Sequence, residues 1–197
     1  MIVDLTIGLS EKMPSYPGDP EFKIQRVASI DSEGWNASKL SFSTHCGTHV
    51  DAPFHMFAKG KKLDEFSIEK FIGQAVVIDI RAKKPDLRKV QRDDIVFFLT
   101  GHTRKIYSGS FYKKNPLIPP EAAKELCKRR AKMIGIDSYS PDNYPFTVHK
   151  LLLKQDILIV ENLINLEKLL KKRFSCFVLP LKLVGADAAP CRVIAVC

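Results

Sequence analysis

Histidine is scarce in this 197-residue chain, yet three of its five histidines fall within eleven residues of one another. They belong to the run His45-Cys-Gly-Thr-His49-Val-Asp51-Ala-Pro-Phe-His55. Imidazole and carboxylate groups together form the ligand set of zinc, manganese or iron. The run therefore predicts a metal site. A hydrolytic centre is the first chemistry to consider, because a metal ion lowers the pKa of bound water to about 7.

The pattern around these residues indicates an extended chain. A spacing of four could place His45 and His49 on one helical turn. However, Gly47 weakens a helix, and Pro53 is incompatible with a helix interior. In an extended chain, side chains alternate between two faces, so His49 and Asp51 would point to the same side. Gly47 would let the backbone bend so that His45 returns to that side.

Two further candidate ligands lie far downstream of this run. His149 belongs to an expected helix, Phe146 to Leu153. Glu161 lies at the C-terminal end of an expected strand, Ile157 to Val160. Catalytic groups often occupy the C-terminal ends of strands in α/β folds. The predicted ligands, for one or two divalent ions, are therefore His45, His49, Asp51, His149 and Glu161.

The last histidine of the run has a different expected role. His55 lies just past Pro53 and can take or give a proton near pH 7 without being a ligand. A closed structural zinc site is the main alternative for the cluster, but such sites are usually richer in cysteine. The residue types therefore favour a catalytic metal centre.

Composition argues against several other classes of function. The chain has 31 basic and 22 acidic residues, and its 45% hydrophobic and 27% charged residues are ordinary for a globular protein. Basic residues do not alternate with stacking aromatics, so we expect solvated faces, or a surface that attracts an anionic substrate, and no nucleic-acid partner. No apolar run approaches the roughly 18 residues of a membrane span, so no membrane association is expected.

The cysteines and the N-terminal segment predict a cytoplasmic protein. The first residues lack the basic and apolar regions of a signal peptide. The five cysteines form an odd set without a CxxC pair, which favours a reducing compartment. In the extended geometry Cys46 would face away from the metal. We expect Cys176, Cys191 and Cys197 to be small core residues.

The rest of the sequence predicts a single α/β domain over residues 1–197, because no linker or repeat divides it. Continuous apolar runs indicate strands that are covered on both faces. These runs lie at 74–80, 94–100, 133–137, 157–160 and 176–183. Weaker strand candidates, without helices between them, lie at 2–9, 23–30 and 39–44. An antiparallel part is therefore expected early in the chain.

Three expected helices each precede an apolar strand, which argues for parallel strands in the later half of the chain. The helices are 119–131, 146–153 and 165–172. Residues 101–115 are expected to form a long loop. Loops of that length are often functional.

The run from His45 to His55 resembles the motif H-x-G-T-H-x-D-x-P-x-H of the cyclase family of metal-dependent hydrolases, which includes bacterial kynurenine formamidase and isatin hydrolase. The motif fixes seven of eleven positions, so it is specific. Other segments resemble the family nearly from end to end: the PGD turn in 13–19, the GID segment in 135–141, the E-N-L run at 161–163, and the endings at 179–183 and 187–192.

This resemblance implies a swivelling β/β/α fold with three layers, in which one sheet is parallel and another antiparallel. It implies zinc or manganese as the metal and His55 as the general acid and base. The implied ligands are His45, His49 and Asp51 for the first metal, and Asp51, His149 and Glu161 for the second where two are bound. Family members are usually homodimers or homotetramers.

Aromatic residues are the expected substrate contacts. The kynurenine enzymes carry tryptophan just before the PGD turn, where it packs on the aromatic substrate. Tyr16 occupies that position here and can still stack on an aromatic ring. We also predict Phe57 as a substrate contact, and the loop around His102, Tyr107 and Phe111 could shape the pocket.

The predicted reaction is hydrolysis of an amide C–N bond, in a formamide such as N-formylkynurenine or in a cyclic amide. A metal-activated hydroxide would attack the carbonyl carbon, and His55 would protonate the leaving nitrogen. Two alternatives stay open. One is ester or lactone hydrolysis at the same site, and the other is a basic, non-enzymatic binding protein with a structural metal.

Overall fold

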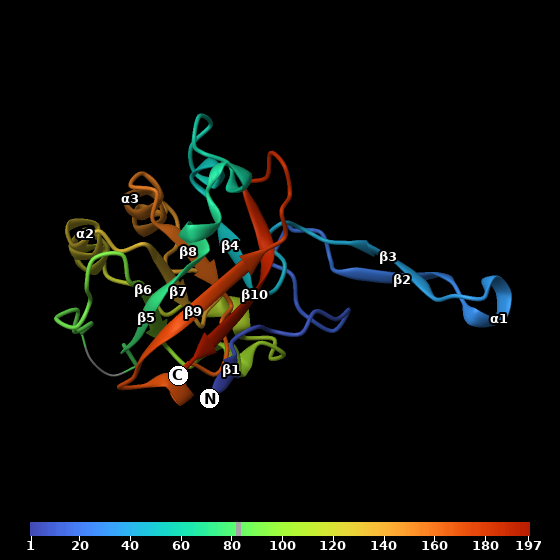
Figure 1. The fold of residues 1–197 in the computed structure, drawn as a ribbon, viewed down its shortest axis with the longest axis horizontal. Coiled ribbons are helices and arrows are strands. Elements are labelled where there is room, and N and C mark those ends of the chain that lie inside the picture. Colours follow the sequence, from blue (N-terminus) through green and yellow to red (C-terminus); the bar gives the residue numbers. More distant parts are fainter. Residues whose placement is uncertain (82–83) are drawn as a thin grey trace.

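In the computed structural model, which describes residues 1–81 and 84–197, the described residues form an eight-stranded mixed sheet and a separate two-stranded hairpin. The order across the large sheet is β1-β10-β4-β8-β7-β6-β5-β9, and β10 also pairs with β9. This last pairing closes the sheet into a barrel, to which β1 is added at β10 (Figure 1). The strands of the large sheet are β1 (Ile2–Asp4), β4 (His49–Asp51), β5 (Ile72–Asp79), β6 (Ile95–Leu99), β7 (Met133–Ile136), β8 (Leu158–Glu161), β9 (Arg173–Pro180) and β10 (Ala188–Val196).

The barrel has a parallel half and an antiparallel half. Strands β5, β6, β7 and β8 run parallel, whereas β4, β9 and β10 pair antiparallel with their neighbours. Helices α2 (Pro120–Arg129) and α3 (Thr147–Leu153) precede β7 and β8 and lie together on one side of the barrel (Figure 1). The predicted mixture of parallel and antiparallel strands is confirmed, but both belong to one closed sheet. The finer assignment to the swivelling type stays a prediction.

Alternation along the central strands divides the core into two layers. In β6, Ile95, Phe97 and Leu99 point into the barrel, while Val96 and Phe98 pack beneath the helices. All five side chains are fully buried. The prediction that such continuous apolar runs are covered on both faces is therefore confirmed for β6.

The prediction of a third helix, at residues 165–172, is wrong. The segment forms a 3-10 helix over Leu166–Leu169, because Asn165 and Lys171 both have φ of 62°, a left-handed conformation that a right-handed helix does not allow. The strand that follows, β9, is antiparallel to both of its neighbours and not part of a parallel unit. Cys176 and Cys191 lie in the core as predicted, but Cys197 is exposed because it ends the chain beyond β10.

Residues 23–41 form an arm that projects away from the barrel (Figure 1). The arm contains β2 (Lys23–Ala28), a short helix α1 (Ile30–Glu33) and β3 (Ala37–Ser41). Several large apolar side chains on it are exposed, namely Ile24, Val27, Ile30, Trp35 and Leu40. A two-stranded hairpin is marginally stable in water by itself, and exposed apolar side chains grouped in this way are unusual on the surface of a monomer.

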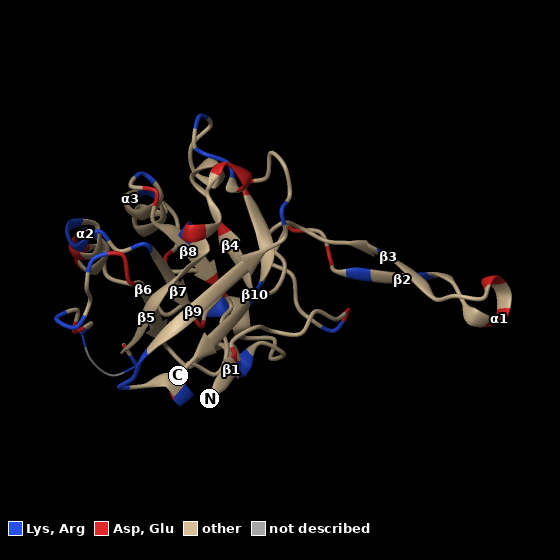
Figure 2. Ribbon diagram, in the orientation of Figure 1, with Lys and Arg blue, Asp and Glu red and all other residues tan. Residues whose placement is uncertain are grey.

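Charge is spread over the molecule. Figure 2 shows Lys and Arg on α2, on loops and on the arm, with Asp and Glu interspersed among them. This distribution agrees with the interpretation of the basic residues as solvated faces. Within residues 1–81 and 84–197, no helix has both the length and the apolar character needed to span a membrane.

Candidate metal centre

The short strand β4 places the first two candidate ligands. Its residues alternate, so that Val50 is fully buried in the barrel core while His49 and Asp51 point to the opposite face. β4 lies between β8 and β10, and its register sets His49 directly opposite Glu161. Antiparallel pairing thus brings together two candidate ligands that are distant in the sequence.

Gly47 returns the chain to the same face, as the sequence predicted. Its φ of +63° lies in the left-handed region that favours glycine, and a Cβ there would lie 2.4 Å from Leu9 Cδ2. The bend brings His45 Nδ1 to 2.9 Å from Asp51 Oδ1. Cys46 packs in an apolar cluster beside the site. Burial raises the pKa of its thiol to about 11, so it stays protonated and is a poor ligand.

Hydrogen bonds orient two of the histidines. His49 Nδ1 donates to the Gly47 carbonyl at 2.9 Å, and His149 Nδ1 donates to Asp142 Oδ1 at 2.5 Å. Each bond leaves Nε2 facing the site, and both Nε2 atoms lie 3.4 Å from an oxygen of Glu161. An acceptor behind the ring, which fixes the tautomer and the ring plane, is a recurrent feature of metal-ligating histidines.

The five predicted ligands, which we call the ligand set, form two overlapping groups of donor atoms. In each group the atoms lie within 4.8 Å of one another, and Asp51 belongs to both groups. His49 Nε2 and both carboxylate oxygens of Asp51 are buried and make no well-formed hydrogen bond among the described residues; their close polar neighbours are other members of the ligand set, such as His45 Nδ1 at 2.9 Å from Asp51 Oδ1. Burying such polar and charged atoms costs free energy unless a bound ion or another partner compensates for the lost water. The ligand set therefore fits a divalent cation.

Electrostatic coupling within the site is strong. Burial by itself lowers the pKa of His45, but the carboxylates of Asp51 and Asp187 outweigh it and raise that pKa to about 9. Burial is likewise outweighed at His149, whose pKa is raised to about 10 chiefly by Asp142. Without a cation, the imidazoles therefore hold protons at neutral pH. A cation has to displace these protons when it binds.

His55 lies beside the ligand set. It ends a 3-10 turn, Pro53–His55, and its ring centroid is 4.2 Å from that of His45 and 6.0 Å from that of His149. Its Nδ1 atom is 3.5 Å from Asp187 Oδ2. The ring also borders a cavity of about 530 Å³, where it could exchange protons with a bound molecule.

Aromatic side chains form one wall of this cavity. Tyr16, Tyr112 and Tyr139, which we call the aromatic wall, pack edge to face or tilted, with ring centroids 5.0–6.1 Å apart. Tyr16 therefore lines the cavity, and its role as a substrate contact stays a prediction. Tyr112 comes from the predicted long loop, and Tyr139 follows β7. No pattern in the sequence singles out either residue.

Two other predicted pocket residues lie elsewhere. Phe57 packs against the core beneath α2 and α3 and lines a separate groove, because the turn at Pro53–His55 directs it away from the cavity. Its prediction as a substrate contact is therefore not supported by its position. His102 is buried, donates from Nε2 to the Phe111 carbonyl at 2.8 Å and stacks on the Phe111 ring. It stabilises the loop that carries Tyr112.

Two carboxylates that orient the histidines have no distinguishing pattern in the sequence. Asp142 lies in no recognised motif, and Asp187 belongs to the C-terminal segment that resembles the family. Asp187 directly precedes β10, whose first residue pairs with Asp51 of β4. Since this pairing joins residues far apart in the chain, local sequence patterns carry no signal for it.

A protein-family model described as "Putative cyclase" matches residues 3–143, which is more than half of the chain. The chain belongs to the cyclase family. The resemblance seen in the His45 to His55 motif is thereby confirmed. Relatives in the family include a kynurenine formamidase from Geobacillus thermodenitrificans, which is 34% identical over 96% of this chain and 94% of its own length. A kynurenine formamidase from Erythrobacter litoralis is 32% identical over 98% of this chain and 92% of its own length.

Solved structures agree with this assignment. Isatin hydrolase A from Labrenzia aggregata, bound to benzyl benzoate, superposes with a TM-score of 0.86 at 26% identity and covers 99% of this chain and 93% of its own. A structure described as a "Potential Metal-Dependent Hydrolase With Cyclase Activity" has a TM-score of 0.81 at 26% identity, with 99% and 96% covered. These likenesses run over nearly the whole chain, so they include every element that carries the ligand set.

The raised histidine pKa values predict how metal stabilisation depends on pH. The folded-state pKa of His45, about 9, lies above its ordinary value of 6.5. Its protonated form therefore stabilises the metal-free fold fully below pH 6.5, and this contribution is lost as pH rises through 9. Over the same window protons cease to compete with the metal. We expect the unfolding temperature gained by adding zinc to increase from pH 6.5 to 9, as measured by calorimetry on stripped and loaded protein.

The expected size of this effect is up to about 1.4 kcal/mol per pH unit for each proton displaced. Titration calorimetry at pH 7.5 in buffers of different ionisation enthalpy should detect the released protons. A zinc-induced stabilisation that stays constant across this pH range would contradict the assignment of protonated histidines to the metal-free site.

Proposed function

We propose that this protein is a metal-dependent hydrolase that cleaves amide C–N bonds in small aromatic substrates. The observation that carries the proposal is the ligand set, whose two donor groups share the buried carboxylate of Asp51, beside an open cavity. Mixed imidazole and carboxylate donors suit zinc or manganese, and the two groups provide for one or two ions. The resemblance to kynurenine formamidases and isatin hydrolases supports the same reaction class.

The protein residues divide the work of the reaction. A bound divalent cation would supply Lewis acidity for the substrate carbonyl and acidify water enough for it to act as a nucleophile at neutral pH. His55 lies outside the two donor groups around Asp51 and borders the cavity. With its Nδ1–H directed at Asp187, its Nε2 would take a proton from the attacking water and then give it to the leaving nitrogen. Once it is protonated, the leaving nitrogen can depart as a neutral amine, which makes cleavage of the C–N bond feasible.

The aromatic wall indicates the substrate class. Tyr16, Tyr112 and Tyr139 present ring surfaces to the same cavity as His55. Aromatic pairs contribute about 0.5–1.5 kcal/mol beyond the area that they bury. An aryl formamide such as N-formylkynurenine, or a cyclic aryl amide such as isatin, would place its ring on this wall and its carbonyl toward the ligand set. Tyr16 is half exposed and accessible to such a ring.

Ester hydrolysis is the second candidate function. The Labrenzia isatin hydrolase was solved with benzyl benzoate, the benzyl ester of an aromatic acid, bound to it. The same cavity and ligand set would accept an ester carbonyl, and an alcohol leaving group depends less on a proton from His55. A non-enzymatic protein with a structural metal is disfavoured, because structural sites are closed whereas this one adjoins a cavity of about 530 Å³.

A substrate panel with controlled metal content tests the proposed function. The protein would be stripped with a chelator, reloaded with zinc or manganese, and assayed on N-formylkynurenine, formanilide, isatin, a simple lactam and an aryl ester. We expect hydrolysis of at least one aryl amide, loss of activity after stripping, and recovery on reloading. Turnover of the ester alone would favour the second candidate. Stoichiometric metal without any turnover would contradict hydrolase function.

A variant of His55 should separate proton transfer from metal binding. We expect His55→Ala to keep the metal content of the wild type but to lower kcat for an amide by about 10²–10⁴, the usual contribution of general acid–base catalysis. His49→Ala serves as the contrasting variant and should lose metal and activity together. Metal content would be measured by elemental analysis beside steady-state kinetics. Unchanged amide turnover in His55→Ala would remove this residue from the mechanism.

We also propose a homodimer or homotetramer in the cytoplasm, assembled through the arm. The exposed apolar residues of the arm, including Trp35 at 61% and Ile24 at 49% exposure, would be buried against another copy of the chain. Light scattering should give a mass that is a multiple of 22.2 kDa for the wild type. The double variant Ile24→Ser, Trp35→Ser should shift toward the monomer, whereas Tyr107→Ser, which changes an exposed aromatic outside the arm, should not. A monomeric wild type would contradict the assembly.

A further inference from the structure

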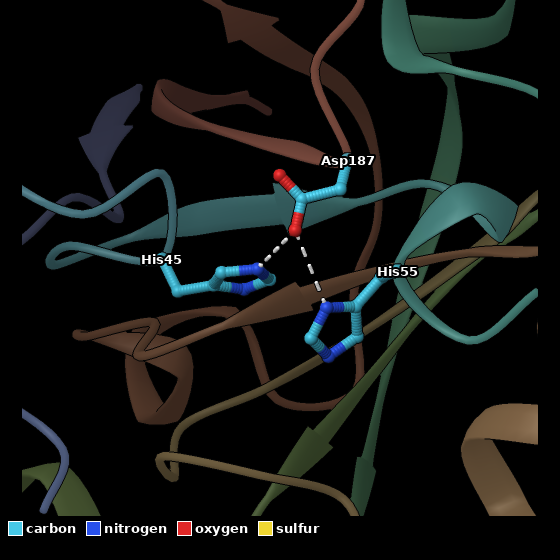
Figure 3. A group of neighbouring side chains, drawn as sticks. All are labelled: His45, His55 and Asp187. Carbon is cyan, nitrogen blue, oxygen red and sulfur yellow. Dashed lines mark hydrogen bonds and ion pairs between the residues drawn. The ribbon is translucent and has the colours of Figure 1, made fainter. Parts of the chain in front are cut away.

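Asp187 faces two histidines that have different proposed roles. Its Oδ2 atom lies 2.9 Å from His45 Nε2 and 3.5 Å from His55 Nδ1, so a single oxygen faces both rings (Figure 3). Its other oxygen, Oδ1, accepts a hydrogen bond from Thr44 Oγ1 at 3.0 Å. The carboxylate thus connects a residue of the ligand set with the proposed acid and base.

The backbone holds Asp187 firmly in this position. Its carbonyl accepts a hydrogen bond from the Ala52 N–H at 2.8 Å, directly after β4. On the other side of Asp187, the Gly185 N–H donates to Asp64 Oδ1 at 2.9 Å. The residue is therefore fixed relative to Asp51 by strand pairing, and its side chain is a rigid reference point for both rings.

A carboxylate can only accept hydrogen bonds, so it determines which ring nitrogen carries the proton. In the neutral form of His45 that binds a metal, Nε2 donates to Asp187 and Nδ1 carries no hydrogen; Nδ1 is the atom that lies 2.9 Å from Asp51 Oδ1. At His55, Nδ1 faces Asp187, which leaves Nε2 available on the cavity side. In each ring, the nitrogen that does not face Asp187 is the one with a proposed role: Nδ1 of His45 in metal binding and Nε2 of His55 in proton transfer.

The other two histidines of the ligand set have acceptors of their own. His49 donates to the Gly47 carbonyl, and His149 donates to Asp142. Asp187 differs because it serves a ligand and the proposed acid and base at the same time. Loss of its carboxylate would therefore affect two steps, metal binding through His45 and proton transfer through His55.

We propose that Asp187 is a positioning residue that sets the tautomer and orientation of His45 and His55 together, and thereby couples metal binding to proton transfer. The part that concerns proton transfer rests on the proposed function, whereas the part that concerns metal binding does not. Asp187 acts through the two rings and not on the substrate itself.

The first test measures metal binding without substrate. Zinc affinity would be determined by competition with a chelator for the wild type and Asp187→Asn, alone and in a His45→Ala background. We expect Asp187→Asn to weaken zinc binding by about 10–100-fold, the usual effect of removing the acceptor behind a ligating histidine. In the His45→Ala background, the same change should have an effect of less than about twofold, because the residue through which Asp187 acts is absent.

The second test reads the tautomers directly. In zinc-loaded protein with ¹⁵N-labelled histidine, long-range ¹H–¹⁵N correlation spectra distinguish a protonated Nδ1 from a protonated Nε2. We expect His55 to carry its proton on Nδ1 in the wild type. In Asp187→Asn it should shift toward the Nε2–H form that free histidine side chains prefer. A role of Asp187 that is merely structural would leave this tautomer unchanged.

The third test uses amide hydrolysis, if the substrate panel provides a substrate. At saturating zinc, Asp187→Asn should lower kcat by about 10–100-fold with KM nearly unchanged. It should have an effect of less than about twofold in the His55→Ala background. Asp64→Asn is the matched control, since Asp64 anchors the same loop without contacting either ring. Unfolding curves for both variants would show that the fold is retained.

The outcomes separate the two proposals. If no amide is hydrolysed, the zinc and tautomer measurements still decide whether Asp187 positions the rings. Wild-type zinc affinity together with an unchanged His55 tautomer in Asp187→Asn would overturn the inference, even if the protein is an active hydrolase. An additional zinc ion per subunit that is lost in Asp187→Asn would also overturn it, because Asp187 would then be a ligand.

Discussion

The buried carboxylate of Asp51 is the constraint on which the rest of the site depends. It is almost fully excluded from solvent, and among the described residues its nearest polar neighbours are the imidazoles of His45 and His49, at 2.9 and 3.4 Å from Oδ1. Removing a carboxylate from water costs several kcal/mol, so this group needs positive charge close by. Protonated imidazoles supply that charge in the metal-free protein, and a divalent cation would replace them. The competition between protons and metal gives the site its expected pH dependence.

The closed barrel makes this concentration of charge possible. Strand β4 has three residues and would be unstable alone, but β8 pairs on one side and β10 on the other. β8 contributes Glu161, and the residue that precedes β10 is Asp187. Helix α3 then brings His149 over the carboxyl end of β8. A short strand held between two others therefore collects groups from three distant parts of the chain at one edge of the barrel.

Acceptors behind the rings turn this collection of groups into an ordered site. Each ring donates a hydrogen bond from one nitrogen to an acceptor behind it: the Gly47 carbonyl, Asp142 or Asp187. The other nitrogen of the ring is thereby directed toward the proposed metal or the cavity. The aromatic wall lines the same cavity as His45, His149 and Glu161, so a bound molecule would meet both aromatic rings and polar groups. This combination of apolar and polar surfaces is what recognition of a small aryl amide requires.

The sequence by itself predicted the residues of the ligand set. It also determined the bend at Gly47 and the shared face of His49 and Asp51, because glycine conformations and the two-residue period of a strand are local properties. It also indicated most strands of the barrel, since their apolar runs are continuous. Only the tertiary structure decided that the sheet closes and that 165–172 is not an α-helix. It also decided that Phe57 turns away while Tyr112 and Tyr139 line the cavity. Asp142 and Asp187 belong to the same group, because strand and helix pairing between distant segments, and not any local pattern, sets which carboxylate stands behind each histidine.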